Sequence, residues 1–365
     1  MPILAYKKIS KENLLKMLEE IAKEEELIAP VEMYGGEALF QPVKDVSDIT
    51  FNYVNTLFPP KQFLLPRFEK ILTYKKENGE LRVEEPIEAP KRTIFGIRSC
   101  DVEGIRYSEY FYSGKMFGRE DLADPHFMAR RNNLTIISVS CQNPAPTCFC
   151  VCCDGGPFLE EGFDLQLTDL GENWLCEVGS EKGMALVEKF SSLFEDAKEE
   201  EIKRRKELED EVLGKFGPYP AFSGATLRRV TEGNIPRQVW ESLGERCVVC
   251  GGWQFLCPCC FCYTVVDIGD ENEGYRARIW DSCHYEGYSR LAGGPNPRKS
   301  RDRRRERCIF HKFSWQYVER MGRHGCVGCG RCVITCMGYV HMPQTVWEIR
   351  SAFREESYKK EAKVK

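Results

Sequence analysis

The sequence predicts an α+β protein with two domains. We expect a mixed α/β domain over residues 1–220 and a smaller domain of helices and loops over 221–365. Apolar β-rich runs separated by polar segments, together with helical periodicity near the N-terminus, predict the first domain. From about residue 226 the chain becomes dense in cysteine, glycine and arginine, which predicts the second. A chain of 365 residues can bury a sizeable core, so this fold does not depend on disulfides.

The N-terminal segment carries a clear helix signal. Ser10 is a suitable N-cap, and apolar residues then recur at i, i+3, i+4 and i+7, namely Leu14, Met17, Leu18 and Ile21. Residues 27–34 ("LIAPVEMY") have an extended pattern. Residues 58–66 ("FPPKQFLLP") are interrupted by proline, and we expect no helix there.

Two short apolar runs predict buried strands, "KRTIFGIRSC" (91–100) and "NNLTIISVSC" (132–141). Residues 181–215 are expected to be helical, with a charged and solvated face. "FGPYPAFSG" (216–224) is expected to be a connector, which sets the domain boundary near residue 220.

Composition restricts the classes of function. The net charge of −4 and the pI near 5.9 argue against nucleic acid and anionic membranes as partners. The N-terminus has no signal-peptide pattern and no run approaches a membrane span, so we expect a cytoplasmic protein. Nineteen cysteines, an odd number, then indicate metal or redox chemistry rather than disulfides, and favour an anaerobic host.

The strongest motif is "CVGCGRCVITC", with the spacing C-x2-C-x2-C-x3-C. Its ligands would be Cys326, Cys329, Cys332 and Cys336. In two-cluster ferredoxins the first three cysteines of such a run bind one [4Fe–4S] cluster, and the fourth binds the other. A zinc site favours two separated C-x2-C pairs instead. We therefore predict a ferredoxin-like domain with two [4Fe–4S] clusters.

The partner run is "CVVCGGWQFLCPCCFC" (247–262), in which Trp253 stands at the third ligand position. The crossed assignment places Cys257 with the first three cysteines of the other run. Cys247, Cys250 and Cys336 would then hold the second cluster with a replacement ligand. The candidates for that ligand are Cys259, Cys260, Cys262 and Cys283. The alternative is that these cysteines are small buried hydrophobic side chains near the clusters.

A third group of thiols lies in the N-terminal half. Cys100 and Cys141 each follow a predicted strand, and if these strands are parallel neighbours, both sulfurs emerge at one sheet edge. Cys148 and Cys150 on the next loop could complete a third [4Fe–4S] site. The alternative is a redox-active or structural group of thiols. Asp101 could form hydrogen bonds within the site.

Two further patterns carry little chemistry of their own. The basic run "RKSRDRRRER" (298–307) is expected to form salt bridges or to supply positive charge near anionic clusters rather than to bind nucleic acid. No G-x-G-x-x-G pattern follows a predicted strand, so NAD(P) and FAD are expected on another protein of the same complex.

The chain resembles the family of the β subunit of cytosolic sulfhydrogenases, which is close to an iron–sulfur subunit of anaerobic sulfite reductase. The residues that carry this resemblance are "GIRSCDVEGI" (96–105), "CQNPAPTCFC" (141–150), "GFDLQLTDLG" (162–171), "RIWDSCHYEGYSRLAGGPNPR" (278–298), "RDRRRERCIFHKFSW" (301–315) and "CVGCGRC" (326–332).

The resemblance implies an iron–sulfur subunit that passes electrons. It implies two partners, of which one is a flavin- and NAD(P)-binding subunit. The other is a catalytic subunit, either of a [NiFe] hydrogenase or of a sulfite reductase. Trp253 departs from the family pattern, which has cysteine there, and Cys259 stands at a position that is not usually cysteine.

The leading hypothesis is therefore an electron-relay subunit with two or three [4Fe–4S] clusters and no substrate chemistry of its own. A zinc-stabilised binding or regulatory module is one alternative, and it would be colourless and free of sulfide. A self-contained iron–sulfur reductase, with its substrate at the Cys100 and Cys141 site, is the other.

Overall fold

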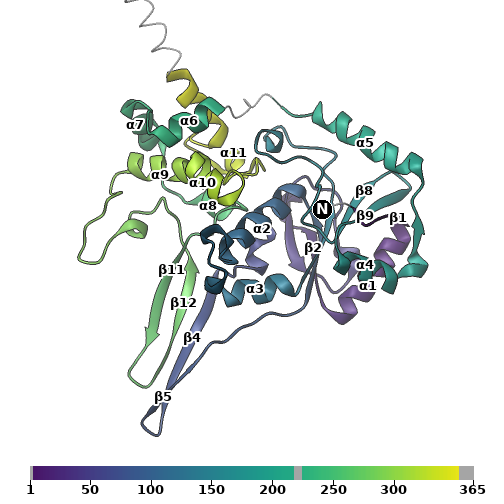
Figure 1. Cartoon of the computed structure of the whole chain (residues 1–365), viewed down its shortest axis with the longest axis horizontal. Coiled ribbons are helices and arrows are strands. Elements are labelled where there is room, and N and C mark those ends of the chain that lie inside the picture. Colours follow the sequence, from purple (N-terminus) through teal and green to yellow (C-terminus); the bar gives the residue numbers. More distant parts are fainter. Residues whose placement is uncertain (1–2, 218–223, 353–365) are drawn as a thin grey trace, which may run out of the picture.

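The structure, a computed structural model, describes residues 3–217 and 224–352 and has the predicted α+β character. Its larger part is built on an eight-stranded mixed sheet (Figure 1). The strand order is β10 (Phe194–Asp196), β1 (Ala5–Ser10), β9 (Asn173–Val178), β8 (Leu165–Asp169), β7 (Leu134–Val139), β6 (Arg92–Ile97), β2 (Glu26–Glu32) and β3 (Ala38–Pro42).

Helices cover both faces of this sheet. On one face, α1 (Lys11–Glu24) and α4 (Glu181–Lys189) pack against side chains such as Phe95 and Ile137. On the other, α2 (Ser99–Tyr112) and α3 (Pro125–Asn132) pack against Ile94 and Ile136. Because adjacent strand residues point to opposite faces, the central strands β6, β7 and β8 are buried along nearly their whole length, as expected for a sheet covered on both sides.

The predicted N-terminal helix is confirmed. The Ser10 hydroxyl accepts a hydrogen bond from the Asn13 amide at 3.1 Å, which satisfies one of the free N–H groups of the first turn of α1. The four apolar residues of the pattern are buried against the sheet.

The two predicted strands are β6 and β7, and they are parallel neighbours. The parallel part of the sheet runs β2, β6, β7 and β8, so the carboxyl ends of these strands meet at one edge. Cys100 lies in the first turn of α2, just after β6, and Cys141 lies two residues after β7. Both cysteines therefore lie at the same edge, which is the arrangement that a third site requires.

Two predictions about local structure need correction. Residues 181–215 are not one helix, because β10 separates α4 from α5 (Glu199–Leu213). Phe194 is buried and pairs with Ile9, which draws the chain into the sheet. Residues Pro60–Phe63 form a short 3₁₀ helix, where proline in the first turn loses no hydrogen bond. Most of the expected connector, 218–223, falls outside the described residues.

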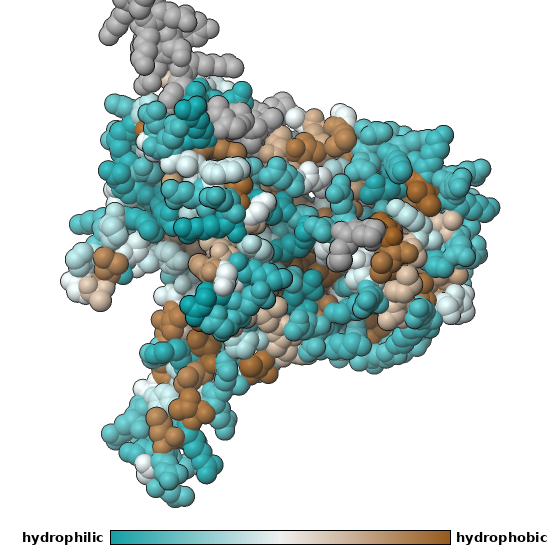
Figure 2. Space-filling model, in the orientation of Figure 1, coloured by the Kyte–Doolittle hydropathy of each residue, from teal (hydrophilic) through white to brown (hydrophobic). Residues whose placement is uncertain are grey.

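A second sheet has four antiparallel strands in the order β11 (Tyr263–Gly269), β12 (Glu273–Trp280), β4 (Phe68–Glu77) and β5 (Glu80–Glu84). It projects from the body of the molecule (Figure 1), and exposed apolar side chains lie along it (Figure 2). The sheet joins strands from both sides of the expected boundary near residue 220. The division into two domains remains a prediction.

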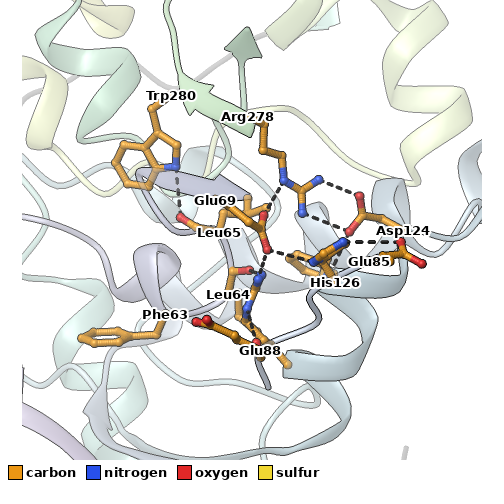
Figure 3. A network of polar contacts seen from close by, with 12 residues as sticks. Phe63, Leu64, Leu65, Glu69, Glu85, Glu88, Asp124, His126, Arg278 and Trp280 are labelled. Carbon is orange, nitrogen blue, oxygen red and sulfur yellow. Dashed lines mark hydrogen bonds and ion pairs between the residues drawn. The ribbon is translucent and has the colours of Figure 1, made fainter. Parts of the chain in front are cut away.

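A buried ionic network anchors this projecting sheet to the larger part of the structure (Figure 3). Glu69 of β4 accepts from Arg278 of β12 at 2.5 Å and also pairs with Arg130 of α3. Arg278 reaches Asp124, the N-cap of α3, at 2.6 Å, and His126 lies 3.4 Å from Glu69. Because Glu69 lies between two buried guanidinium groups, loss of its charge would leave both without their shared partner.

The C-terminal part consists of short helices around a separate core that includes Trp240, Ile309 and Phe313. These helices are α6 (Gly224–Glu232), α7 (Arg237–Arg246), α8 (Gly252–Phe255), α9 (Arg301–Phe313), α10 (Trp315–Met321), α11 (Arg331–Thr335) and a helical segment at 342–352. Within residues 3–217 and 224–352, no helix combines the length and apolar character that a membrane span needs.

Candidate metal centre

The loop of the strongest cysteine motif is tightly wound. Gly328 and Gly330 have φ values of 64° and 79°, in the left-handed region that favours glycine. The Gly328 carbonyl accepts from the Phe149 amide at 2.8 Å, and a Cβ at Gly328 would lie 2.5 Å from the Cys150 backbone. The loop thus packs directly against the segment that carries the N-terminal thiols.

Cys257 lies near the first three cysteines of this loop, and the crossed assignment of ligands stays a prediction. Its charge acts on Cys326, Cys329 and Cys332, and burial raises the pKa of Cys329 to about 12. Buried thiols of this kind need a compensating positive charge to become thiolates. Iron would supply that charge, so this donor set fits a [4Fe–4S] cluster.

A buried lysine lies against this group. Lys312 donates to the Cys257 sulfur at 3.3 Å and to the Gly325 carbonyl at 2.7 Å. Burial lowers the pKa of this ammonium, but the surrounding cysteines outweigh burial and raise it well above the ordinary value. Lys312 is therefore charged at neutral pH, and its position favours negative charge on these sulfurs.

The second set contains Cys247, Cys250 and Cys336. The Cys250 sulfur accepts from the Gly252 amide at 3.4 Å, and the Cys336 sulfur accepts from the Val340 amide at 3.2 Å. Hydrogen bonds from amides to sulfur are the interactions that stabilise bound thiolates. These two sulfurs already have such donors.

Trp253 occupies the position of the missing cysteine and is buried. Its ring packs edge-on against His284 at 5.0 Å and under the Arg305 guanidinium at 4.7 Å. Arg305 is 1% exposed, and in the described part of the chain its Nε and Nη1 atoms have no hydrogen-bond partner. Its positive charge favours the thiolate form of Cys247. A buried guanidinium with free donors fits an anionic group in this place.

The spare cysteines divide between two places. Cys259 and Cys260 contact Cys257, and the charge of Cys326 acts on Cys259, so both belong to the Cys257 side. Cys262 contacts Cys283, which contacts Cys308. The His284 ring, next to Cys283 in the chain, contacts Cys247 of the second set. The ligand that replaces Trp253 stays a prediction.

Sequence reasoning missed Cys308 and His284. Cys308 lies on the inward face of α9, where the buried side chains are Arg304, Arg305, Cys308, Ile309, Lys312 and Phe313. That helical periodicity is the signal that could have identified it. Within the basic run at the start of α9, Arg303 forms a salt bridge with Glu306 at 3.2 Å, as expected.

The N-terminal thiols form a third group at the edge of the large sheet. Negative charge on Cys141 and Cys148 raises the pKa of Cys150, in addition to burial, and negative charge on Cys150 adds to the effect of burial on the pKa of Cys100. Burial raises the pKa of all four, that of Cys148 to about 11. Like Cys329 and Cys332, these buried thiols with raised pKa values fit a metal that holds them as thiolates.

This third group is adjacent to the Cys257 group. Asn55 accepts from the Cys100 thiol at 3.5 Å and donates to the Cys329 carbonyl at 2.7 Å. Asp101 and Arg331 form a buried two-pronged ion pair, at 2.6 and 2.8 Å, next to the same two cysteines. On the other side, α11 carries Cys332 of the Cys257 group and ends directly before Cys336 of the second set. The three groups of thiols therefore follow one another through the structure.

Comparison with known proteins agrees with this donor chemistry. A family model described as a 4Fe-4S dicluster domain matches residues 246–340, which include Cys247, Cys250, Cys257 and the four cysteines of 326–336. Sulfhydrogenase 2 subunit beta of Pyrococcus furiosus is 31% identical over 314 residues, covering 85% of this chain and 88% of that protein. No solved structure matches the chain.

Proposed function

Because the chain belongs to the family of sulfhydrogenase β subunits, we propose that it relays electrons between two partners. One is a flavin- and NAD(P)-binding subunit, whereas the other is the catalytic subunit of a [NiFe] hydrogenase. The role of the chain as an iron–sulfur electron-transfer protein follows from the family and the dicluster match. An anaerobic sulfite reductase is the second choice of catalytic partner. When bound, each [4Fe–4S] cluster takes up and gives up one electron at a time.

The observation that supports the proposal best is the contiguity of the three thiol groups. Asn55 connects Cys100 with the backbone of Cys329, and Cys329 belongs to the same group as Cys257. The chain holds these groups in water-poor surroundings, since most of the thiols are buried or half-buried. It also places Lys312 beside the Cys257 group, which favours the added negative charge.

We propose three [4Fe–4S] clusters, with the N-terminal group as the third. The test is iron and acid-labile sulfide per chain in protein purified without oxygen. About twelve of each supports three clusters, and about eight supports two. Zinc without sulfide would replace the relay with the zinc-stabilised module.

The functional test is Cys329→Ser in the assembled complex. We expect loss of NAD(P)-linked hydrogenase activity, with retention of the catalytic subunit's activity toward an artificial dye. Cys176→Ser is the matched control, because Cys176 is a buried thiol within β9. Retained NAD(P)-linked activity in Cys329→Ser would contradict the relay.

One observation favours the reductase alternative. A cavity of about 420 Å³ lies at the carboxyl edge of the large sheet, and its lining includes Tyr53, Asn55, Arg98 and Cys141. Ligands of α/β proteins commonly bind at this edge. If the chain were a self-contained reductase, the isolated protein supplied with a chemical reductant would turn over a small substrate, whereas a relay protein would not.

A further inference from the structure

Four side chains with metal-binding chemistry meet beside the second set of thiols, whose Cys247 also contacts the His284 ring. Cys262 immediately precedes β11, Cys283 and His284 follow β12, and Cys308 lies on α9. The thiol of Cys283 contacts the thiols of both Cys262 and Cys308, and the His284 ring contacts Cys308. Three separate segments thus converge on one point at the base of the projecting sheet.

The spacing of three of these ligand atoms suits one metal ion, and Cys262 adjoins them through its contact with Cys283. The Cys283 sulfur, a ring nitrogen of His284 and the Cys308 sulfur all lie within 4.8 Å of one another. A tetrahedral zinc ion with Zn–S bonds of about 2.3 Å places its ligands about 3.8 Å apart. The thiolates of a [4Fe–4S] cluster bind four different irons and surround a body of eight atoms, so they stand farther apart.

The state of the histidine points to a ligand. His284 is 2% exposed, and its Nε2 atom has no hydrogen-bond partner within the described residues. A buried ring nitrogen without a partner is costly unless a metal or a donor completes it. Three cysteines and one histidine form a donor set that is common for structural zinc.

We propose that Cys262, Cys283, His284 and Cys308 bind one zinc ion, separate from the iron–sulfur clusters. The ion would join both ends of the β11–β12 hairpin to α9, and so fix the projecting sheet to the cluster-bearing helices. A cavity of about 530 Å³, lined in part by Cys262, Cys283 and Cys308, gives the ion a way in.

The test is the zinc, iron and labile sulfide content of the untagged protein, purified without oxygen. We expect about one zinc per chain in the wild type. Cys308→Ser should lower zinc at least tenfold and leave the iron, the sulfide and the electron paramagnetic resonance of the reduced clusters unchanged. Cys176→Ser, a buried thiol in the large sheet, should change neither metal.

A second variant covers the case in which Cys308→Ser does not fold. His284→Gln should also lose zinc while it keeps its iron. Absence of zinc from the wild type would overturn the proposal, and so would loss of iron with retained zinc in either variant, because these side chains would then serve a cluster. Iron content tests the relay and zinc content tests this site, so the two proposals can fail independently.

Discussion

Removal of the Lys312 charge is predicted to lower the reduction potential of one cluster. The ammonium lies 3.3 Å from the Cys257 sulfur and is buried, so water screens it poorly. Reduction adds negative charge beside this cation. Lys312→Met retains a long side chain of similar volume and deletes the charge, which makes the added electron less stable.

The magnitude follows from Coulomb's law. A unit charge 3.3 Å from a sulfur interacts with a unit charge there by about 5 kcal/mol at an effective dielectric constant of about 20. The added electron spreads beyond this one sulfur, so we expect about half of this energy. About 2.5 kcal/mol corresponds to roughly 100 mV for a one-electron couple, because 59 mV is a tenfold change in the equilibrium constant.

The assay is an anaerobic redox titration followed by electron paramagnetic resonance. One cluster should shift by about −100 mV in Lys312→Met, and Lys312→Arg should restore most of the shift. Lys182→Met is the matched control, because Lys182 donates to the Asn132 carbonyl at 3.0 Å in the N-terminal part. A shift below about 30 mV in every cluster, or an upward shift, would refute the reasoning.

Three other predictions follow from packing and charge. Glu69→Gln should destabilise the protein by about 3–5 kcal/mol in chemical unfolding, because two buried guanidinium groups lose their shared carboxylate; a change below about 1 kcal/mol would contradict this. Gly104→Ala raises helix propensity by about 1 kcal/mol, but its Cβ would overlap the Pro258 side chain, so iron content should fall. Unchanged iron content and stability would show that the loop around Pro258 moves to accommodate the methyl group. Trp253→Cys restores the C-x2-C-x2-C-x3-C run, so labile sulfide should be at least as high as in the wild type, and a loss would show that the ring supports the site.

The local parts of this structure were predictable from the sequence. The Ser10 cap, the four buried apolar residues of α1 and the strands β6 and β7 depend on neighbours within a few positions. The cysteine spacing of 326–336 likewise specifies one loop. The parallel pairing of β6 and β7, which the sequence alone leaves conditional, brings Cys100 and Cys141 to one edge.

The long-range parts were not predictable. In the projecting sheet β4 pairs with β12, which lies roughly two hundred positions away in the chain. The local sequence pattern of either strand does not predict which strand it pairs with. The same limit applies to Cys308, which stands alone on a basic helix and meets Cys283 only because the β11–β12 hairpin returns there. β10 interrupted the expected helix because Phe194 gains more from pairing with β1 than from helical continuity.

Buried cations bear on the reduction potentials of all three thiol groups. Arg331, beside Cys100 and Cys329, is neutralised by Asp101. Lys312 and Arg305 lie against sulfur, an aromatic ring and carbonyl or hydroxyl oxygens, so their charges remain available to the Cys257 and Cys247 groups. An unopposed positive charge stabilises an added electron more than an ion pair does. In the N-terminal group the corresponding cation is Arg98, which is buried, donates to the backbone carbonyls of Tyr53 and Ser140, and favours negative charge on Cys141. Each of the three groups therefore has one buried cation whose charge favours reduction.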